Sequence, residues 1–180
     1  ATLATSATLN LYPIDGSPAA RAGEGREGIF NMARELQSKP YPYRSIYLPI
    51  IRDQIPEALS TFDFPDASLV TSERDTTNVP SQSLYLMNNP QAISAADAFA
   101  KRIASYEGTP IERLTHAYQL AFARPPTAAE LAAIQTFWAR FPDQAAGGKQ
   151  TQQAKDYGKS AALSAFCQSL FASAEFRYLN

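Results

Sequence analysis

Two helix-start signals in the second half of the chain constrain its fold most strongly. They are Thr109-Pro110-Ile111-Glu112 and Thr127-Ala128-Ala129-Glu130, and both place Thr three residues ahead of Glu. In such a capping box the Thr hydroxyl accepts the backbone N–H of the Glu, whose carboxylate reaches back to the Thr N–H. Arg124-Pro125-Pro126 stops the first helix just before the second begins. The pattern predicts two helices joined by a short turn, which makes them antiparallel neighbours.

Helix signals continue on both sides of this pair. Pro80 and Pro90 each suit the first turn of a helix, and Asn89 can cap the second of these helices. Residues 90–107 place apolar side chains three and four positions apart, namely Ile93, Ala96, Phe99, Ala100 and Ile103. These features predict amphipathic helices that share one core.

A last helix is expected over about residues 159–173, where apolar side chains recur with helical spacing. A polar connection over residues 142–158 precedes it. Residues 79–178 are therefore predicted to form a helical bundle with short links.

The N-terminal third has a different character. Residues 1–28 are rich in Ala, Ser, Thr and Gly, so we expect this part to be peripheral or partly irregular. Ile46–Ile51 favours an extended segment, which Pro49 restricts to an edge or interrupted strand. The predicted fold class is therefore mainly α: an irregular multi-helix bundle with an extended, Pro-rich N-terminal third and at most a small β element. Residues 1–180 are expected to form a single domain excised from a larger protein.

Composition excludes several classes of partner. The formal net charge is −1 and no long basic run is present, which argues against a nucleic-acid partner. No segment approaches about 18 uninterrupted apolar residues, so no membrane span is predicted in this segment. Cys167 is the single cysteine and lies in an apolar helical pattern, which predicts a buried, inert thiol and no internal disulfide.

No catalytic motif stands out, so we predict no catalytic residues and no enzyme activity. His116 is the only histidine and cannot build a multi-histidine metal site, so it is expected to be a solvated residue on a helix face. The chain has no CxxCH haem-attachment motif and no Gly-rich phosphate loop. We therefore predict no metal site and no cofactor in this domain.

Polar residues are concentrated in the loop at 61–90, which leaves two alternatives. Its carboxylates and amides could organise the loop through hydrogen bonds, with Arg74 forming a bidentate pair that pins it to the bundle. Alternatively, the loop could bind a polysaccharide or a divalent cation, and paired carboxylates could even serve glycoside hydrolysis. The candidate residues are Asp63, Asp66, Arg74, Asp75 and Gln82.

A second candidate surface lies in the Pro-rich segment, where Tyr41, Tyr43 and Tyr47 surround Arg44. Exposed tyrosines beside an arginine could bind a sugar or a protein. The same residues could equally be half-buried packing residues. We keep Tyr43, Arg44 and Tyr47 as candidate ligand-binding residues.

The string FDFPDASLVTSERDTTNVPSQSLYLMNNP resembles the C-terminal domain of unknown function of large, planctomycete-type multidomain proteins. LAFARPPTAAEL is similar to a second segment of that family, with Ala123 in place of the usual Gly, and FCQSLFASAEF is similar to its ending. The matching positions are Tyr43, Arg44, Ser45, Tyr47, Phe62, Asp63, Pro65, Arg74, Thr77, Pro80, Gln82, Leu84, Leu86, Asn88 and Pro90.

The resemblance implies a parent protein that carries a cytochrome-c-like domain and is exported to the periplasm, cell envelope or extracellular space. Haem would then belong only to the rest of the parent chain, and the partners would be its other domains. The resemblance implies no activity for this piece. The leading hypothesis is a non-enzymatic structural or interaction module; the alternative is a polysaccharide- or divalent-cation-binding domain that uses the loop at 61–90.

Overall fold

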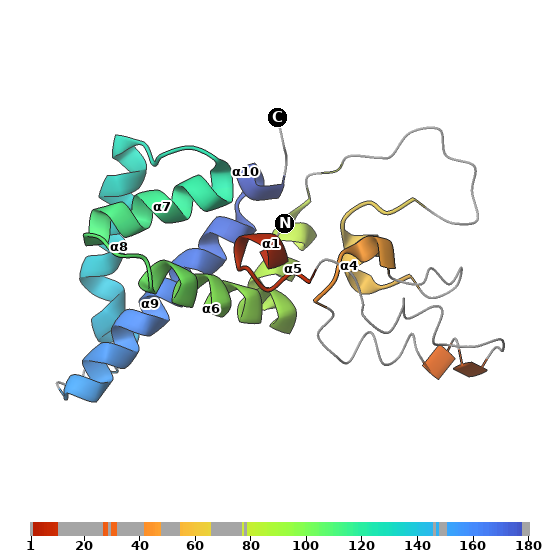
Figure 1. Ribbon diagram of the computed structural model, residues 1–180, viewed down its shortest axis with the longest axis horizontal. Helices are drawn as coiled ribbons and strands as arrows, with labels where there is room; N and C mark the ends of the chain where they lie inside the picture. Colours follow the sequence, from red (N-terminus) through yellow and green to blue (C-terminus); the bar gives the residue numbers. More distant parts are fainter. Residues whose placement is uncertain are drawn as a thin grey trace. The chain divides into compact units, whose positions relative to one another are not determined.

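Four helices begin at the residues that the capping signals predict. In the computed structural model they are α5 (Pro80–Asn88), α6 (Pro90–Ala104), α7 (Pro110–Phe122) and α8 (Ala128–Ala145) (Figure 1). The structure describes residues 2–10, 27–28, 30–31, 42–47, 55–65, 77, 79–145, 147 and 151–177. This part of the chain is mainly α-helical, as predicted.

The caps have the expected hydrogen bonds. Asn89 Oδ1 accepts the N–H groups of Gln91 at 2.9 Å and Ala92 at 3.4 Å, which fixes the start of α6. Thr109 Oγ1 accepts the Glu112 N–H at 3.3 Å, and the Glu112 carboxylate accepts the Thr109 N–H at 2.7 Å. Both capping-box predictions are therefore confirmed, since Thr127 and Glu130 make the same pair of bonds ahead of α8.

The predicted polar connection at 142–158 is wrong at both ends. Helix α8 continues to Ala145, and α9 (Gln152–Ala172) begins seven residues before the predicted start at 159. Thr151 caps α9 by accepting the Ala154 N–H at 3.3 Å, and Gln152 donates to Asp156 one turn later at 2.9 Å. Local polar bonds rather than an apolar stripe support this first part of α9.

The expected extended segment at Ile46–Ile51 is also wrong where the structure describes it. Ser45–Tyr47 form a short 3-10 helix, closed by the Tyr47 N–H donating to the Arg44 carbonyl at 3.0 Å. The prolines on both sides of this segment lack a backbone N–H, which limits the length of any strand here. The local turn satisfies the backbone groups of the segment instead. Within the described residues, the β structure is limited to one parallel bridge between Asn10 and Tyr43.

The chain divides into two compact units. One comprises Ala1–Ala7 and Leu86–Asn180, and the other comprises Thr8–Tyr85, so the division falls within α5. The prediction of a single domain, with residues 1–28 at its periphery, stays a prediction. In the second unit, α4 (Glu57–Thr61) leads into the polar loop.

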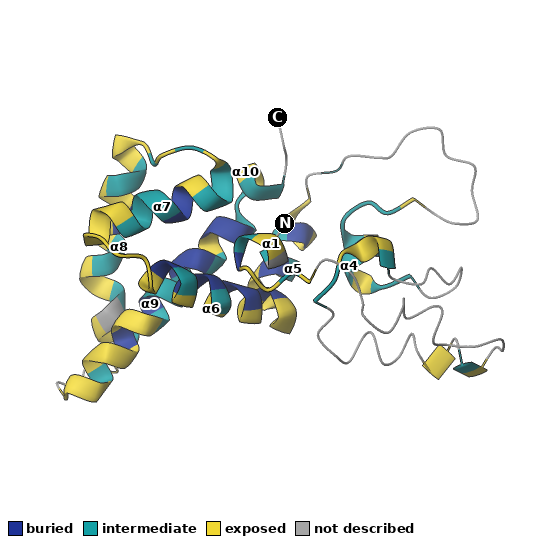
Figure 2. Ribbon diagram, viewed as in Figure 1, coloured by how far each residue is buried: buried dark blue, intermediate teal, exposed yellow. Residues whose placement is uncertain are grey.

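The first unit contains the helical core. Helix α9 packs against both α6 and α8, and buried residues line its contact with α6 (Figure 2). Phe99 of α6 and Phe171 of α9 are fully buried, with ring centroids 5.6 Å apart. Burying a phenylalanine side chain contributes about 1.5–3 kcal/mol. Because each helix buries one apolar face here, α6 and α9 are held in a fixed arrangement.

Both ends of this unit are tied to its core. The short helix α1 (Thr2–Thr5) receives a hydrogen bond from Arg102 of α6, whose Nη1 donates to the Thr5 carbonyl at 2.6 Å. The last short helix, α10 (Ala174–Arg177), places Phe176 against Phe171 with ring centroids 4.9 Å apart. The first and last described residues of this unit are therefore anchored to α6 and α9.

Candidate functional site

Asp63, Thr77 and Gln82 form a hydrogen-bonded cluster in the second unit. Asp63 Oδ2 accepts the Thr77 N–H at 2.9 Å, and the Thr77 hydroxyl lies 2.7 Å from Asp63 Oδ1. The buried Gln82 Nε2 lies 3.3 Å from both Asp63 Oδ2 and Thr77 Oγ1. Asp63 has a φ of 56°, a left-handed conformation that Asp tolerates better than most residues.

This geometry favours the first alternative for the loop at 61–90, in which polar groups organise the chain. The Asp63 carboxylate receives donors from a backbone amide, a hydroxyl and a side-chain amide, which occupy its oxygens. Asp66, Arg74 and Asp75 lie outside the described residues, so their roles stay predictions.

The structure places Tyr43 and Tyr47 as half-buried residues, while Arg44 between them is exposed. The Tyr43 backbone takes part in the bridge to Asn10. Ile46, on the same short turn, is 78% exposed. The binding role of Tyr43, Arg44 and Tyr47 stays a prediction.

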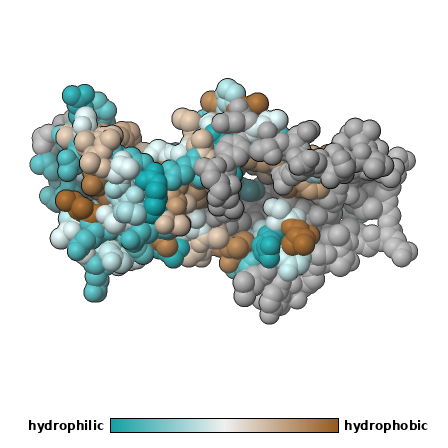
Figure 3. Space-filling view, turned by 90° about the horizontal axis from the view of Figure 1, so that it is seen from above, coloured by the Kyte–Doolittle hydropathy of each residue, from teal (hydrophilic) through white to brown (hydrophobic). Residues whose placement is uncertain are grey.

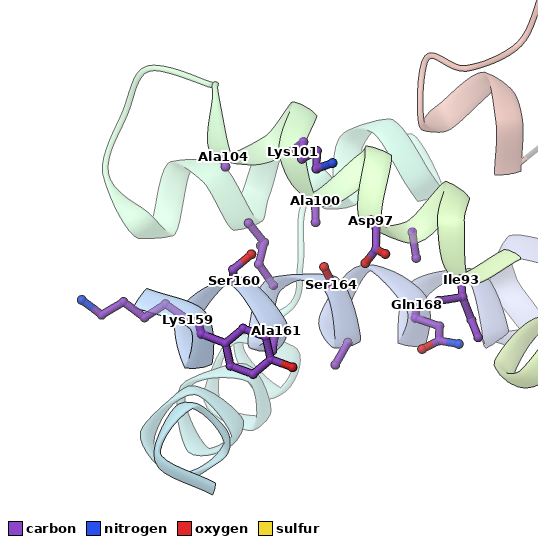
Figure 4. A pocket seen from close by; sticks show the side chains of 14 residues that line it. Ile93, Asp97, Ala100, Lys101, Ala104, Lys159, Ser160, Ala161, Ser164 and Gln168 are labelled. Carbon is purple, nitrogen blue, oxygen red and sulfur yellow. The ribbon is translucent and has the colours of Figure 1, made fainter. Parts of the chain in front are cut away.

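A surface groove that no sequence motif predicts lies between α6 and α9 (Figure 4). The groove has a volume of about 670 Å³ and lies within the first unit. Small residues recur along both helices and line the groove: Ala96, Ala100 and Ala104 on α6, and Ala161, Ser164 and Ala165 on α9. Because these side chains are short, a hollow remains where the two helices meet.

Two lysine side chains border the groove and extend in different directions (Figure 4). Figure 4 shows Lys101, Ala104 and Lys159 toward one end and Ile93 and Gln168 toward the other. Within the described part of the chain, neither lysine ammonium group has an ion-pair or hydrogen-bond partner. With Asp97 in the same lining, the groove carries charges of both signs.

Two exposed, larger apolar side chains border the groove. Tyr157 of α9 is 65% exposed and Ile93 of α6 is 39% exposed. Tyr157 lies on α9 ahead of the predicted helix start at 159, so placing it there required the helix to be recognised from residue 152 onward. The Thr151 capping signal could have shown this, whereas the meeting of α6 and α9 depends on tertiary packing.

Beneath the groove, Cys167 is fully buried in the core, as predicted. Burial, together with the nearby charge of Asp97, raises the pKa of its thiol to about 12. The thiolate is the reactive form of cysteine, so this side chain behaves as a small apolar core residue.

His116 is not the solvated residue that the sequence suggests. It is half-buried and stacks on Tyr106, with ring centroids 4.3 Å apart and planes 17° from parallel. Arg113 Nε donates to the Tyr106 carbonyl at 3.0 Å. The histidine thus covers the turn between α6 and α7.

Arg124 is the centre of an ionic cluster that joins three helices. Its guanidinium donates to both carboxylate oxygens of Glu130, to both of Glu175 and to the Pro125 carbonyl. These bonds use all five of its N–H donors. The ring of Tyr118 lies 5.6 Å from the guanidinium carbon. The cluster secures the end of α7 and the start of α10 to the start of α8.

Neither a metal-ligand cluster nor a membrane-spanning helix occurs among the described residues. No three or more His, Cys, Asp or Glu side chains in this part of the chain come together as metal ligands. None of its helices is long and apolar enough to cross a membrane.

The fold and the groove define a mainly α-helical protein with a surface hollow between two core helices. The family model described as a protein of unknown function, DUF1553 (PSD1), matches residues 1–138 of the 180-residue chain. The chain therefore belongs to the DUF1553 family, and the expected domain of unknown function is confirmed. No curated protein and no solved structure matches the chain.

Proposed function

We propose that this chain is a non-enzymatic interaction module that uses the α6–α9 groove to dock another part of its parent protein. The observation that carries the proposal is the groove itself, bordered by the exposed side chains of Tyr157 and Ile93. Tyrosine is enriched at protein interfaces because it combines a large apolar ring with a polar tip.

Exposed apolar residues do not by themselves mark a docking surface on this protein. Figure 3 shows hydrophobic side chains as small, separate spots among hydrophilic ones on the visible face of the described chain. Scattered apolar residues of this kind are normal on a protein surface. A hollow of about 670 Å³ between two rigid core helices is a more specific feature.

The resemblance supplies the wider setting of the proposal. The module would belong to an exported, cytochrome-associated multidomain protein in the periplasm, cell envelope or extracellular space. Any haem would lie in other parts of that protein, and those parts are the proposed partners. The alternative, a polysaccharide- or cation-binding loop, has less support because the Asp63 carboxylate already receives internal donors.

Site-specific photo-crosslinking in the full-length protein tests the proposal. A photoreactive phenylalanine analogue replaces Tyr157, and mass spectrometry identifies the peptide to which it links. We expect a link to a segment of the parent chain outside these 180 residues. The matched control carries the analogue at Gln135, an exposed position on α8. Equal or no linking at both positions would overturn the proposal.

A further inference from the structure

Side-chain oxygens from both helices meet inside the groove. Figure 4 shows the Asp97 carboxylate of α6 and the Ser164 hydroxyl of α9 directed into the space between the two helices. Ser160 lies four residues before Ser164, so its hydroxyl lines the same face of α9 one turn away. The middle of the groove is therefore polar, and its polar atoms come from both walls.

These side chains are not used within the protein. In the part of the chain that the structure describes, Asp97 has no ion-pair partner, and the side chains of Asp97, Ser160 and Ser164 make no hydrogen bond. Gln168 differs, because its side chain donates to the Met87 carbonyl at 2.6 Å and ties α9 to the end of α5. The carboxylate and the two hydroxyls thus remain available to an occupant of the groove.

The charge that faces into the groove is negative. The Lys101 and Lys159 side chains extend in different directions, whereas the Asp97 carboxylate faces the serine side of the groove (Figure 4). Long lysine side chains commonly keep their ammonium groups in water while their stems cover the surface. A segment that enters between the two helices therefore meets a carboxylate first.

A cationic side chain complements this set of groups. A carboxylate only accepts hydrogen bonds, and a serine hydroxyl accepts as well as donates. An ammonium or guanidinium group brings several donors together with the opposite charge, so it can serve the Asp97 carboxylate and a neighbouring hydroxyl at once. A purely apolar occupant would instead remove these polar groups from water without giving them a partner, which costs free energy.

We infer that the docked segment of the parent protein inserts a positively charged side chain, lysine or arginine, between α6 and α9, where it pairs with Asp97 and donates to Ser160 or Ser164. The inference rests on the proposed docking function and names the chemistry by which the groove recognises its partner. The exposed ring of Tyr157 gives the same segment an apolar contact at the border of the groove.

Charge substitution at Asp97 in the full-length protein tests the inference, with capture by the photoreactive analogue at position 157 as the readout. Asp97→Asn should reduce capture severalfold, and Asp97→Lys should abolish it because two like charges would then meet inside the groove. Asp97 is exposed within this chain, so neither change should unfold it, which circular dichroism checks. Asp143→Asn and Asp143→Lys, at an exposed position on α8, are the matched controls and should leave capture unchanged.

The captured segment provides the second half of the test. Its lysines and arginines are changed one at a time to glutamate, and one of these changes should restore capture in the Asp97→Lys protein. A zero-length carbodiimide joins a carboxylate to a lysine amine in contact with it but does not join it to an arginine. A link from Asp97 to the segment in the wild-type protein therefore identifies a lysine, and restoration without such a link identifies an arginine.

The outcomes separate this inference from the docking function. Capture at position 157 that is unchanged in Asp97→Lys would overturn the inference and leave the docking function standing. Loss of capture that no charge reversal in the segment restores would have the same meaning. Absence of capture in the protein with an intact Asp97 would overturn both proposals.

Discussion

Arg124 and Glu130 form a bidentate ion pair across the turn between α7 and α8. Nη1 and Nη2 of Arg124 lie 2.9 and 2.8 Å from the two carboxylate oxygens of Glu130. Glu130 also accepts the Thr127 N–H at 2.6 Å, so the same carboxylate completes the capping box that the sequence predicts. One residue thus starts α8 and holds it to the end of α7.

Replacement of Arg124 by Lys should lower the melting temperature although the charge is kept. A lysine ammonium cannot present the planar set of five donors that Arg124 directs to Glu130 and Glu175. Thermal unfolding followed by circular dichroism measures the effect, with Arg140→Lys at an exposed position on α8 as the control. Equal melting temperatures for the two variants would show that the cluster does not stabilise the fold.

Acid should weaken the Glu130 contribution within a defined range of pH. Hydrogen bonds from Arg124 lower the pKa of Glu130 from an ordinary 4.5 to about 2, and those from Thr127 assist. As the pH falls, the unfolded chain therefore binds this proton first. The stabilisation is complete above pH 4.5 and is lost as the pH falls to about 2.

Denaturant titrations of wild type and Glu130→Gln at several pH values test this range. Wild type should be the more stable above pH 4.5, and the difference in free energy of unfolding should shrink toward pH 2. Glu107→Gln, at an exposed position, should show no comparable change. A difference between wild type and Glu130→Gln that does not vary with pH would contradict the assignment.

Ala123→Gly should stabilise the protein by about 0.5–1 kcal/mol, because the strain of a left-handed alanine exceeds the entropy that glycine loses on folding. Ala123 has a φ of 58° at the C-terminal cap of α7 and replaces the glycine usual in the family that the sequence resembles. The control, Ala132→Gly within α8, should instead destabilise by about 1 kcal/mol. Chemical denaturation of both variants measures whether each change raises or lowers the free energy of unfolding. A loss of stability in Ala123→Gly would contradict this reasoning.

Asp63→Asn should lower the free energy of unfolding by about 1–2 kcal/mol, since hydrogen bonds to a charged acceptor are stronger than those to a neutral one. Asparagine tolerates the left-handed conformation of Asp63, so the backbone should be unaffected. Calcium should not raise the melting temperature of wild type if Thr77 and Gln82 occupy the carboxylate. Calcium stabilisation that disappears in Asp63→Asn would instead support the cation-binding alternative.

The sequence predicts the starts of α6, α7 and α8, where a side chain caps each helix, because these signals are local. Asn89, Thr109 and Thr127 all cap as expected. The start of α9 was missed because Gln152 and its neighbours are polar, and the apolar period begins only later. Ile46 and Tyr47 favour an extended segment by residue type, yet they lie in a 3-10 turn. Local propensity was overridden there by the surrounding prolines.

The candidate site was less predictable than the fold. Asp63 and Gln82 could be singled out because they lie in one polar segment, and the structure brings both to Thr77. The groove joins residues about 60 positions apart, such as Lys101 and Lys159, and depends on the way α6 packs on α9. A groove of this kind arises because the side chains between the two helices are short. No sequence motif predicts such a groove.

Tyrosine labelling in the full-length protein tests the docking function most directly. Tyr157 is 65% exposed within this chain and Tyr106 is 40% exposed. If the groove is empty, Tyr157 should therefore be modified faster than Tyr106. Covalent labelling followed by mass spectrometry gives the ratio of the two rates. If a segment of the parent protein occupies the groove, Tyr157 should be modified more slowly than Tyr106. Faster modification of Tyr157 would show an empty groove and contradict the proposed function.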